Sequence, residues 1–276
     1  MLSPGSTFSE YEVESIVGAG GLGILYRARQ VRLDRPVALK LVEAEVARDP
    51  VIRERLRREA RTVAALDHPN VVPLYAAGEE EGTVYIVTRW VEGTELGALI
   101  HREGPLEPGR AARTAAQIAS ALEAAHERGL VHRDVKPSNV ILTSEDHVYL
   151  TDFGLAKRAG SAAGLTGVDQ MLGTVDYVAP EQIEGSEPDA RGDVYALACV
   201  LYETLTGEAP FADQKGGMAK MWAQLNAEPP PLRERRPDVP PALEEVVRRG
   251  MAKAPDARPT AAAFRAAVLI AVGEEP

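Results

Sequence analysis

Residues 132–154 constrain this chain more than any other segment, because they combine a short predicted hairpin with polar groups that seldom occur together. The apolar runs Val140–Leu142 and Val148–Thr151 flank a turn at Ser144–His147 and predict two antiparallel strands. A tight hairpin brings its outer ends together, so the polar groups at those ends are expected to converge. They are Asp134, Lys136, Asn139 and Asp152.

This predicted cluster suits metal-dependent phosphate chemistry. Carboxylate and amide oxygens are the ligands that hard cations such as Mg²⁺ prefer, and an amine beside them suits phosphate oxygens. An aspartate that does not bind the metal is available as a base. From the residues alone, Asp134 and Asp152 are interchangeable in these two roles. An ordinary surface hairpin with polar ends is the alternative interpretation.

Composition narrows the class of protein. The chain has 276 residues, 31 Lys plus Arg and 41 Asp plus Glu, which gives a formal net charge of −10. This length supports one large domain or two lobes, and the acidic balance argues against nucleic acid as the main partner. The single cysteine, Cys199, excludes an internal disulfide and a cysteine-built metal site. No membrane-spanning stretch or signal peptide is visible, so we expect a cytoplasmic enzyme.

The first ninety residues predict a small antiparallel sheet with one helix. Residues 1–10 are polar and predict a loose tail. The pattern breaks at 89–93, where we place the boundary between two lobes. The expected strands are Tyr11–Val17, Ile24–Arg29, Pro36–Val42, Val71–Tyr75 and Thr83–Thr88, and the expected helix is Pro50–His68.

A glycine-rich stretch, Gly18–Gly23, joins the first two strands. In a dinucleotide-binding fold a helix would follow such a G-x-G-x-x-G motif. Here Ile24–Arg29 is rich in β-branched and aromatic residues, which predicts a strand instead. A glycine hairpin of this kind can fold over a nucleotide, because no side chains keep its backbone N–H groups from the phosphates. An ordinary glycine-rich hairpin remains the alternative.

Lys40 and Glu59 are predicted to form an ion pair. Lys40 interrupts an apolar strand, and Glu59 lies in the middle of the apolar stripe of the helix. A lone buried carboxylate costs several kcal/mol, whereas two opposite charges ~4 Å apart at an effective dielectric of 20 attract by about 4 kcal/mol. A Glu59 that reaches water from the edge of the stripe is the alternative.

Helices predominate after the boundary. Asp193 stands near the start of a helix that is apolar nearly all round, where it can cap the backbone. A polar, glycine-rich stretch from Lys157 to Leu172 is predicted to be a functional or mobile loop. From spacing alone, Arg258 is expected in a surface loop. The predicted helices are Glu107–Arg128, Asp193–Thr206, Met218–Gln224, Ala242–Met251 and Thr260–Val272.

In their order, these motifs resemble those of protein kinases, most closely the bacterial eukaryotic-like (Hanks-type) Ser/Thr protein kinases, from Tyr11 to Val272. The resemblance implies an α+β, two-lobed fold. Its five-stranded antiparallel N-lobe with one main helix would cover 11–88, the hinge 89–93, and the mainly helical C-lobe 94–272, with an activation segment at 152–181 and a tail at 273–276. It also implies transfer of the ATP γ-phosphoryl group to Ser or Thr of proteins with Mg²⁺, or Mn²⁺ in its place.

The resemblance separates roles that the residues left open. Asp134 matches the base, Lys136 the lysine on the γ-phosphate, and Asn139 and Asp152 the metal ligands. Lys40 and its partner Glu59 match the phosphate-binding pair. The implied nucleotide-binding positions are Val17, Gly18, Ala19, Gly20, Gly21, Leu22, Gly23, Leu25, Ala38, Lys40, Thr88, Arg89, Val91, Glu95 and Ile141.

Other matched positions are structural or regulatory. Glu181 and Arg258 match a buried ion pair, which replaces the surface-loop interpretation of Arg258, and Asp193 matches the acid that holds the catalytic loop. Arg133 is expected to pair with a phosphorylated loop residue.

The candidates for that phosphorylation are Thr166 first and Ser161 second, whereas Thr174 is expected to contact substrate. A catalytically silent nucleotide-binding scaffold and a small-molecule phosphotransferase are the alternatives. Relatives pair through the N-lobe, where Leu33 is a candidate contact, and many continue into a membrane anchor and sensor.

Overall fold

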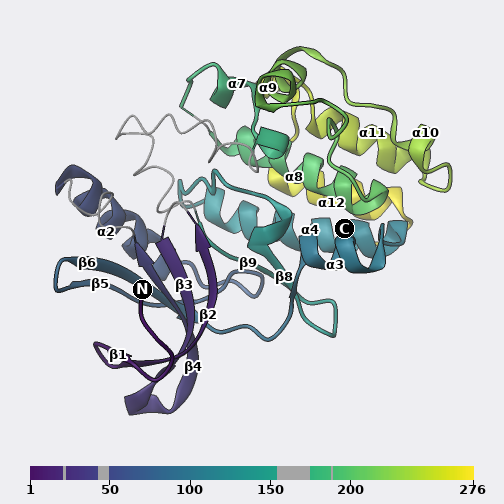
Figure 1. Ribbon diagram of the computed structural model, residues 1–276. Helices are drawn as coiled ribbons and strands as arrows, with labels where there is room; N and C mark the ends of the chain where they lie inside the picture. Colours follow the sequence, from purple (N-terminus) through teal and green to yellow (C-terminus); the bar gives the residue numbers. More distant parts are fainter. Residues whose placement is uncertain (21–22, 43–49, 154–174, 188) are drawn as a thin grey trace. The chain divides into compact units, whose positions relative to one another are not determined.

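The computed structural model describes residues 1–20, 23–42, 50–153, 175–187 and 189–276 (Figure 1). These described residues divide into two compact units. The first unit comprises Met1–Asp67 and Val72–Glu92, and the second comprises His68–Val71, Gly93–Phe153 and the described part of Gly167–Pro276. Five predicted site residues lie outside the described residues: Gly21, Leu22, Ser161, Thr166 and Thr174.

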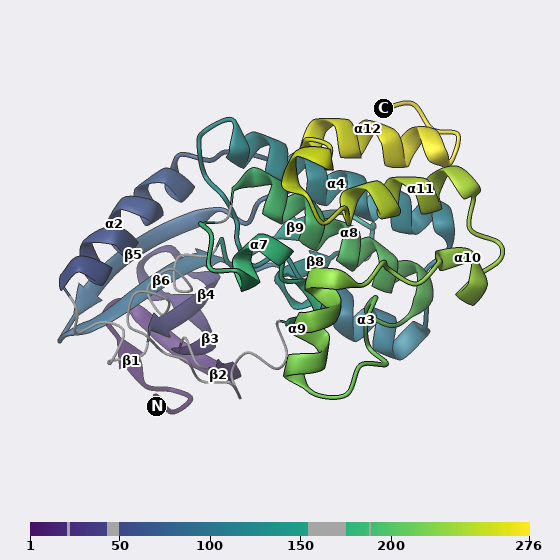
Figure 2. The same cartoon turned by 90° about the horizontal axis from the view of Figure 1, so that it is seen from above.

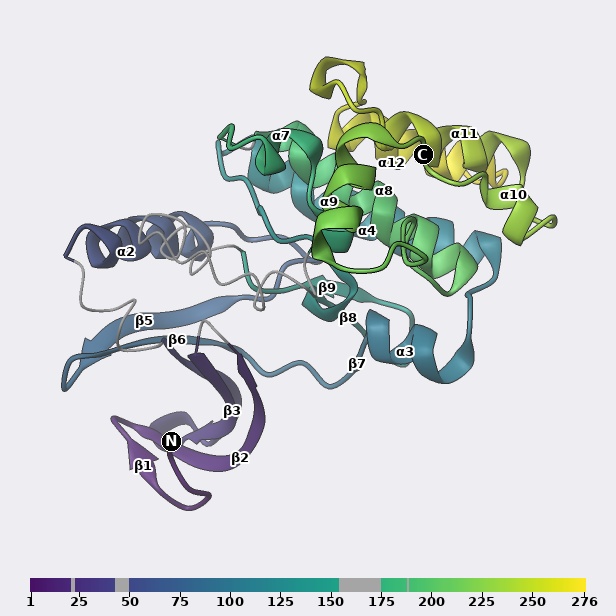
Figure 3. The ribbon, with the colours of Figure 1, turned by 45° about the horizontal axis from the view of Figure 1, so that its top comes forward.

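The first unit is built on an antiparallel sheet with strand order β1-β2-β3-β4-β6-β5. The helix α2 (Pro50–Ala64) lies along β5, as Figure 3 shows. The strands are β1 (Thr7–Phe8), β2 (Tyr11–Gly20), β3 (Gly23–Gln30), β4 (Arg35–Val42), β5 (Leu74–Glu80) and β6 (Thr83–Arg89).

Two predictions for this unit are wrong in detail. The segment 1–10 is not a loose tail, because Thr7–Phe8 pairs with β2 and the backbone N–H of Leu2 donates to the Tyr26 hydroxyl at 3.0 Å. The Phe8 ring packs edge-on against Tyr85, so apolar burial fixes this segment. The predicted strand Val71–Tyr75 begins only at Leu74, since Val71 pairs with Leu150 in the second unit.

Alternation of side chains divides the sheet into two faces. Val37 and Leu39 of β4 are fully buried in an apolar core with Tyr26 and Val87. The intervening residues, Ala38 and Lys40, are only half-buried and project from the opposite face. The core face stabilises the sheet by removing apolar area from water, which leaves the other face available for function.

The second unit combines a small sheet with a helical body. The strands β7 (Thr94–Glu95), β8 (Val140–Leu142) and β9 (Val148–Leu150) form an antiparallel sheet in that order. The helix α8 (Ala190–Thr206) packs against α4, α11 and α12 (Figure 2). The other helices are α3 (Leu96–Glu103), α4 (Pro108–His126), α7 (Pro180–Ile183), α9 (Gly217–Asn226), α10 (Leu232–Arg235), α11 (Pro241–Gly250) and α12 (Ala261–Ala271).

The central position of α8 explains its sequence. Nearly all of its residues from Gly192 to Leu205 are buried, so a helix that is apolar on every side is stable there. The helix α3 is absent from the sequence prediction, although Leu96, Leu99 and Ile100 are its buried residues. Their spacing of three and four residues is the helical signal that could have found it.

Candidate active site

The β8–β9 hairpin forms as predicted. Val140 pairs with Leu150 and Leu142 with Val148, and all four side chains are buried. Outside the strands, the backbone N–H of Thr151 donates to the carbonyl of Asn139 at 2.9 Å. This hydrogen bond joins the arm that carries Asn139 to the arm that leads into Asp152.

The predicted polar cluster gathers around Asp134. Lys136 Nζ lies 2.9 Å from Asp134 Oδ2, and Asn139 Nδ2 donates to the backbone carbonyl of Asp134 at 2.7 Å. Asp134 and Asn139 are 9% and 6% exposed, so the ion pair and the amide stand in a largely dry environment. Attraction between charges is stronger there than in water.

Glu95 belongs to the same electrostatic neighbourhood. Burial raises the pKa of Glu95 most, the negative charge of Asp152 raises it further, and Lys136 opposes this shift. The β7–β8 register pairs Glu95 with Ile141, so these two predicted nucleotide-binding residues stand on one face of the small sheet. The structure therefore brings together the hairpin cluster and two residues that the sequence placed in a separate role.

Asp193 fixes the backbone that precedes Asp134. Its Oδ2 accepts from the N–H of His132 at 2.8 Å, and its Oδ1 accepts from the N–H of Arg133 at 2.7 Å. Arg133 has φ +66°, a left-handed conformation that is strained for an arginine. A buried carboxylate that accepts two successive N–H groups compensates for this strain, which gives Asp193 the position expected of it.

His132 connects the two arms of the hairpin. Its Nδ1 accepts the N–H of Asp134 at 3.2 Å, and its Nε2 lies 2.9 Å from the carbonyl oxygen of Thr151. Complete burial lowers the pKa of His132, so the ring is neutral with its proton on Nε2. The two hydrogen bonds of this imidazole thereby connect the backbone of Asp134 to Thr151, the residue before Asp152.

In the first unit, the strand register gathers the predicted nucleotide-binding side chains on the face opposite the core. Lys40 pairs with Leu25 on one side and with Ile86 on the other, while Ala38 pairs with Thr88. Residues that pair directly across strands project from the same face. Leu25, Ala38, Lys40 and Thr88 therefore share this face, which we call the β3–β4 face. The Lys40–Glu59 ion pair stays a prediction.

Two glycines of the β2–β3 hairpin, Gly18 and Gly23, stand in different surroundings. Gly23 has φ +132°, and a Cβ there would lie 1.9 Å from the carbonyl oxygen of Leu41, so the fold itself requires glycine. At Gly18 an added Cβ would meet no atom of the described residues within 4 Å. Packing among the described residues does not require glycine at Gly18, which fits a position where a ligand approaches the backbone.

Comparison with known proteins decides the family. A family model for the protein kinase domain matches residues 11–269. The chain belongs to the protein kinase family. It is similar to the serine/threonine-protein kinases PknH of Mycobacterium bovis, with 45% identity over 255 residues, and PknE of Mycobacterium tuberculosis, with 43% identity over 254 residues.

Those alignments cover 92% of this chain but only 42% of PknH and 44% of PknE, so this kinase domain spans less than half of either relative. The crystal structure of the Mycobacterium tuberculosis PknI kinase domain is 30% identical, with a TM-score of 0.79, and the match covers 98% of this chain and 100% of that one. The resemblance to bacterial Ser/Thr protein kinases is thereby confirmed. Within the described ranges, no helix of this kinase domain is both long and apolar enough to cross a membrane.

The Glu181–Arg258 ion pair is present, and the surface-loop interpretation of Arg258 is wrong. Arg258 is 2% exposed, and its Nη1 and Nη2 lie 2.7 and 2.8 Å from the two carboxylate oxygens of Glu181. Its Nε donates to the carbonyl of Ala252 at 2.7 Å. Bidentate pairing with further carbonyl acceptors is the arrangement in which a buried guanidinium is stable.

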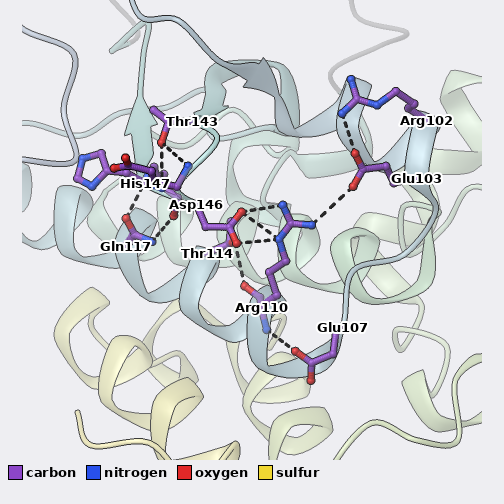
Figure 4. A network of polar contacts seen from close by, with 11 residues as sticks. Arg102, Glu103, Glu107, Arg110, Thr114, Gln117, Thr143, Asp146 and His147 are labelled. Atoms are coloured by element: carbon purple, nitrogen blue, oxygen red, sulfur yellow. Dashed lines mark hydrogen bonds and ion pairs between the residues drawn. The ribbon is translucent and has the colours of Figure 1, made fainter.

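A network at the turn of the hairpin, which the sequence did not reveal, holds the kinase hairpin against α4 (Figure 4). Arg110 Nη2 lies 2.6 Å from Asp146 Oδ1, and its Nε donates to both oxygens of Asp146. Gln117 Nε2 donates to the Asp146 carbonyl at 3.0 Å, while Gln117 Oε1 accepts the N–H of Val148 at 2.9 Å. Arg110 and Gln117 are seven residues apart on one face of a helix otherwise rich in alanine, which is the signal that could have found them.

The same network includes the segment His68–Val71. Asn70 Nδ2 donates to Gln117 Oε1 at 3.0 Å and to the carbonyl of Val148 at 2.9 Å, and His147 Nε2 lies 2.9 Å from the carbonyl of Pro69. The hairpin is therefore held at both ends, by Asp193 and His132 where the predicted catalytic residues stand and by α4 at the turn.

The donor set fits the metal that the kinase family uses. Across the described residues, no group of three or more His, Cys, Asp or Glu side chains could hold a metal ion. Mg²⁺ is commonly held by one or two carboxylates together with phosphate oxygens. Asn139 donates through its Nδ2 to Asp134, which leaves its amide oxygen available to a cation. The chemistry of this donor set, an amide oxygen and a carboxylate with nucleotide phosphates to complete it, is of the kind that a divalent cation accepts.

Proposed function

We propose that this kinase domain transfers the γ-phosphoryl group of ATP to Ser or Thr hydroxyls of proteins. The observation that carries the proposal is the buried cluster in which Asp134 pairs with Lys136 and is hydrogen-bonded by Asn139. Phosphoryl transfer requires mainly positioning and charge neutralisation, and a fixed acid–amine–amide set supplies both.

Each residue of the cluster has a proposed task. Asp134 accepts the proton of the substrate hydroxyl, and its pairing with Lys136 holds the carboxylate in position for that purpose. Lys136 donates to the transferred phosphoryl group, and Asn139 and Asp152 hold Mg²⁺, for which Mn²⁺ can substitute. When bound, the metal neutralises charge on the phosphates.

The β3–β4 face is proposed to bind the nucleotide. Lys40 takes the phosphates with Glu59 as its partner, Leu25 and Ala38 cover the adenine, and Thr88–Val91 offers backbone groups to it. Glu95 and Ile141 are the proposed contacts in the second unit. The support is the common face of Leu25, Ala38, Lys40 and Thr88, together with the space that the described residues leave at Gly18.

The direct test is to incubate the wild-type chain with γ-labelled ATP, Mg²⁺ and a generic protein substrate, followed by phosphoamino-acid analysis. We expect label on Ser and Thr. Asp134→Asn should lose nearly all transfer while its ATP affinity changes little. The matched control is Asp213→Asn, an exposed aspartate outside the cluster, which should transfer normally.

Wild-type-like turnover in Asp134→Asn would contradict the proposed role of that residue. If the wild type binds ATP without transferring label, the catalytically silent scaffold is the correct alternative. Label on a small-molecule acceptor alone would indicate a small-molecule phosphotransferase.

Regulation is proposed to act through Arg133. Its guanidinium is 16% exposed and lies 3.6 Å from the carboxylate of Glu187, an acid that is itself 74% exposed. A phosphate on Thr166, or secondarily Ser161, would offer a stronger partner and order the loop, while Thr174 contacts substrate. Peptide mapping after incubation with ATP should find phosphate on residues 158–172, and its absence would count against autoactivation.

Assembly is a separate proposal. Leu33 is 61% exposed in the first unit, as expected of a contact in a homodimer. Sedimentation of wild type and Leu33→Asp should show a dimer that the variant weakens, and identical sedimentation of the two proteins would exclude this contact.

A further inference from the structure

Arg27 of β3 contacts three residues from two other parts of the first unit. Its Nε lies 2.8 Å from Glu14 Oε2 on β2, and its Nη1 lies 3.5 Å from Glu92 Oε1. Its guanidinium carbon lies 5.0 Å from the centre of the Trp90 ring. One side chain thus connects the β2–β3 hairpin to the segment that follows β6.

The contacts between Trp90 and Glu92 complete this arrangement. Trp90 Nε1 donates to Glu92 Oε1 at 2.8 Å, so the same oxygen receives both the indole N–H and the guanidinium. The ring is consequently fixed with one face toward Arg27, a geometry in which a cation and an indole attract each other. We call Arg27, Trp90 and Glu92 the Arg27 brace.

The brace lies next to the residues assigned to the nucleotide. Arg27 pairs with Ala38, which pairs with Thr88 in turn, so its side chain leaves the sheet on the β3–β4 face. Trp90 stands between Arg89 and Val91, whose backbone groups are the proposed adenine contacts. The brace therefore connects the strand that follows the glycine stretch with the backbone that would recognise the base.

We propose that Arg27 is a positioning residue for ATP, acting through Trp90 and Glu92 to hold the 89–92 segment against β3 in the conformation that binds the nucleotide. This inference rests on the proposed function. When a binding site is already ordered before the ligand arrives, less of the binding free energy is spent on ordering its side chains and backbone. When only a fraction of molecules is competent, the apparent dissociation constant rises in inverse proportion to that fraction.

The ordinary alternative is that Arg27 makes only a surface ion pair, which contributes little. Arg29 provides the comparison within the same strand. It projects from the same face two residues further on, and it pairs with Glu14 at 3.2 Å and Asp34 at 2.7 Å. Arg29 therefore shares the charge, the strand and one of the partners of Arg27, but among the described residues it forms no cation–π contact with Trp90 and no ion pair with Glu92.

The test compares steady-state kinetics of Arg27→Ala and Arg29→Ala with the wild type. Losing a cation–π contact and an ion pair together should raise the KM for ATP of Arg27→Ala about five- to tenfold, with kcat unchanged. Arg29→Ala should leave both constants at wild-type values. Arg27→Lys should lie between Arg27→Ala and wild type, because it keeps the charge but loses the planar fork.

Two variants of the ring separate positioning from general stability. Trp90→Phe keeps an aromatic face for Arg27 and should raise the KM less than Trp90→Ala does. Thermal unfolding of each variant provides the folding control. Equal KM values for Arg27→Ala and Arg29→Ala, or a fall in kcat with unchanged KM, would overturn the proposal.

A spectroscopic readout separates this inference from the proposed function. The chain has two tryptophans, so Trp222→Phe leaves Trp90 as the sole indole. ATP titration should change its emission, and adding Arg27→Ala should shift the emission of the free protein and weaken ATP binding. This result can be obtained even if no phosphoryl transfer occurs. An Arg27→Ala protein with the spectrum and ATP affinity of its parent would refute the brace.

Discussion

The two units hold their predicted functional residues by different physical means. In the second unit, the polar groups at the predicted catalytic end of the hairpin are buried and hydrogen-bonded, namely His132, Asp134, Asn139 and Asp193. In the first unit, the β3–β4 face is set by strand register, and its ion pairs are partly exposed, such as Arg27–Glu14 with 38% and 28% exposed side chains.

This difference indicates that the catalytic residues need a fixed geometry, whereas the nucleotide-binding face tolerates adjustment. Buried hydrogen-bonded groups fix geometry, because leaving any one of them unpaired is costly. Exposed ion pairs contribute little to stability and are screened by salt, so they can influence affinity without determining the fold. We expect changes in the second unit to affect turnover and stability, and changes on the β3–β4 face to affect nucleotide affinity.

The largest effect is expected from Asp193→Asn. The amide has one acceptor oxygen for the two backbone N–H groups of His132 and Arg133, so the segment before Asp134 loses part of its support. Misplacing a catalytic group by about 1 Å can cost about 100-fold in rate, and we predict a loss of kcat of that order with little change in the KM for ATP. A variant that keeps wild-type kcat would break the link between buried anchoring and turnover.

Arg258→Ala should cause the largest loss of stability. It leaves Glu181 as an unpaired carboxylate whose side chain is 12% exposed, and breaking such a buried pair costs about 3–5 kcal/mol. The free energy of unfolding in urea measures this loss. Arg29→Ala, which breaks exposed ion pairs in the first unit, is the control and should unfold like the wild type; equal losses in both variants would remove the distinction between the units.

Gln117→Ala should have a smaller effect of the same kind. The N–H of the buried Val148 loses its acceptor, and the Asp146 carbonyl and Asn70 lose a partner. We predict a loss of about 1–3 kcal/mol in the free energy of unfolding and a moderate fall in kcat. Gln214→Ala removes a glutamine side chain outside this network. It is the matched control and should unfold like the wild type. Unchanged stability would mean that the turn of the hairpin needs no support from Gln117.

The pH dependence of stability offers the finest test of burial in the second unit. Burial lowers the pKa of Lys253 from 10.5 to about 8, although its Nζ donates to the Gln224 carbonyl at 2.8 Å. The unfolded chain therefore binds more protons than the folded one between these values, and this group makes the free energy of unfolding rise with pH in that window.

The measurement is the difference in unfolding free energy between wild type and Lys253→Met, which removes the contributions of other groups. This difference should increase from pH about 8 to about 10.5, the limits given by the shifted and ordinary pKa of Lys253. A flat difference would show that Lys253 is solvated like a surface lysine.

The sequence predicted local features better than long-range ones. The β8–β9 hairpin and its polar cluster were predictable, because a short turn forces residues near in sequence to be near in space. The β3–β4 face followed from the alternation of β4. By contrast, the burial of Arg258 depends on Glu181, 77 positions earlier, and no local pattern contains that information.

The errors have the same origin. Tertiary contacts override local composition at two places. The strand β1 pairs with β2, and Val71 pairs with Leu150 instead of joining β5. The network of Arg110 and Gln117 with the hairpin turn likewise joins segments about thirty positions apart. A sequence can offer a polar stripe on α4, but only the fold shows what the stripe contacts.

The most direct measurement determines ATP affinity and kcat in parallel for Asp134→Asn and Arg27→Ala. We predict opposite outcomes: Asp134→Asn keeps its affinity for ATP and loses turnover, whereas Arg27→Ala loses affinity and keeps turnover at saturating ATP. A change of the same constant in both variants would contradict the division of roles, in which the hairpin performs the chemistry and the β3–β4 face positions the nucleotide.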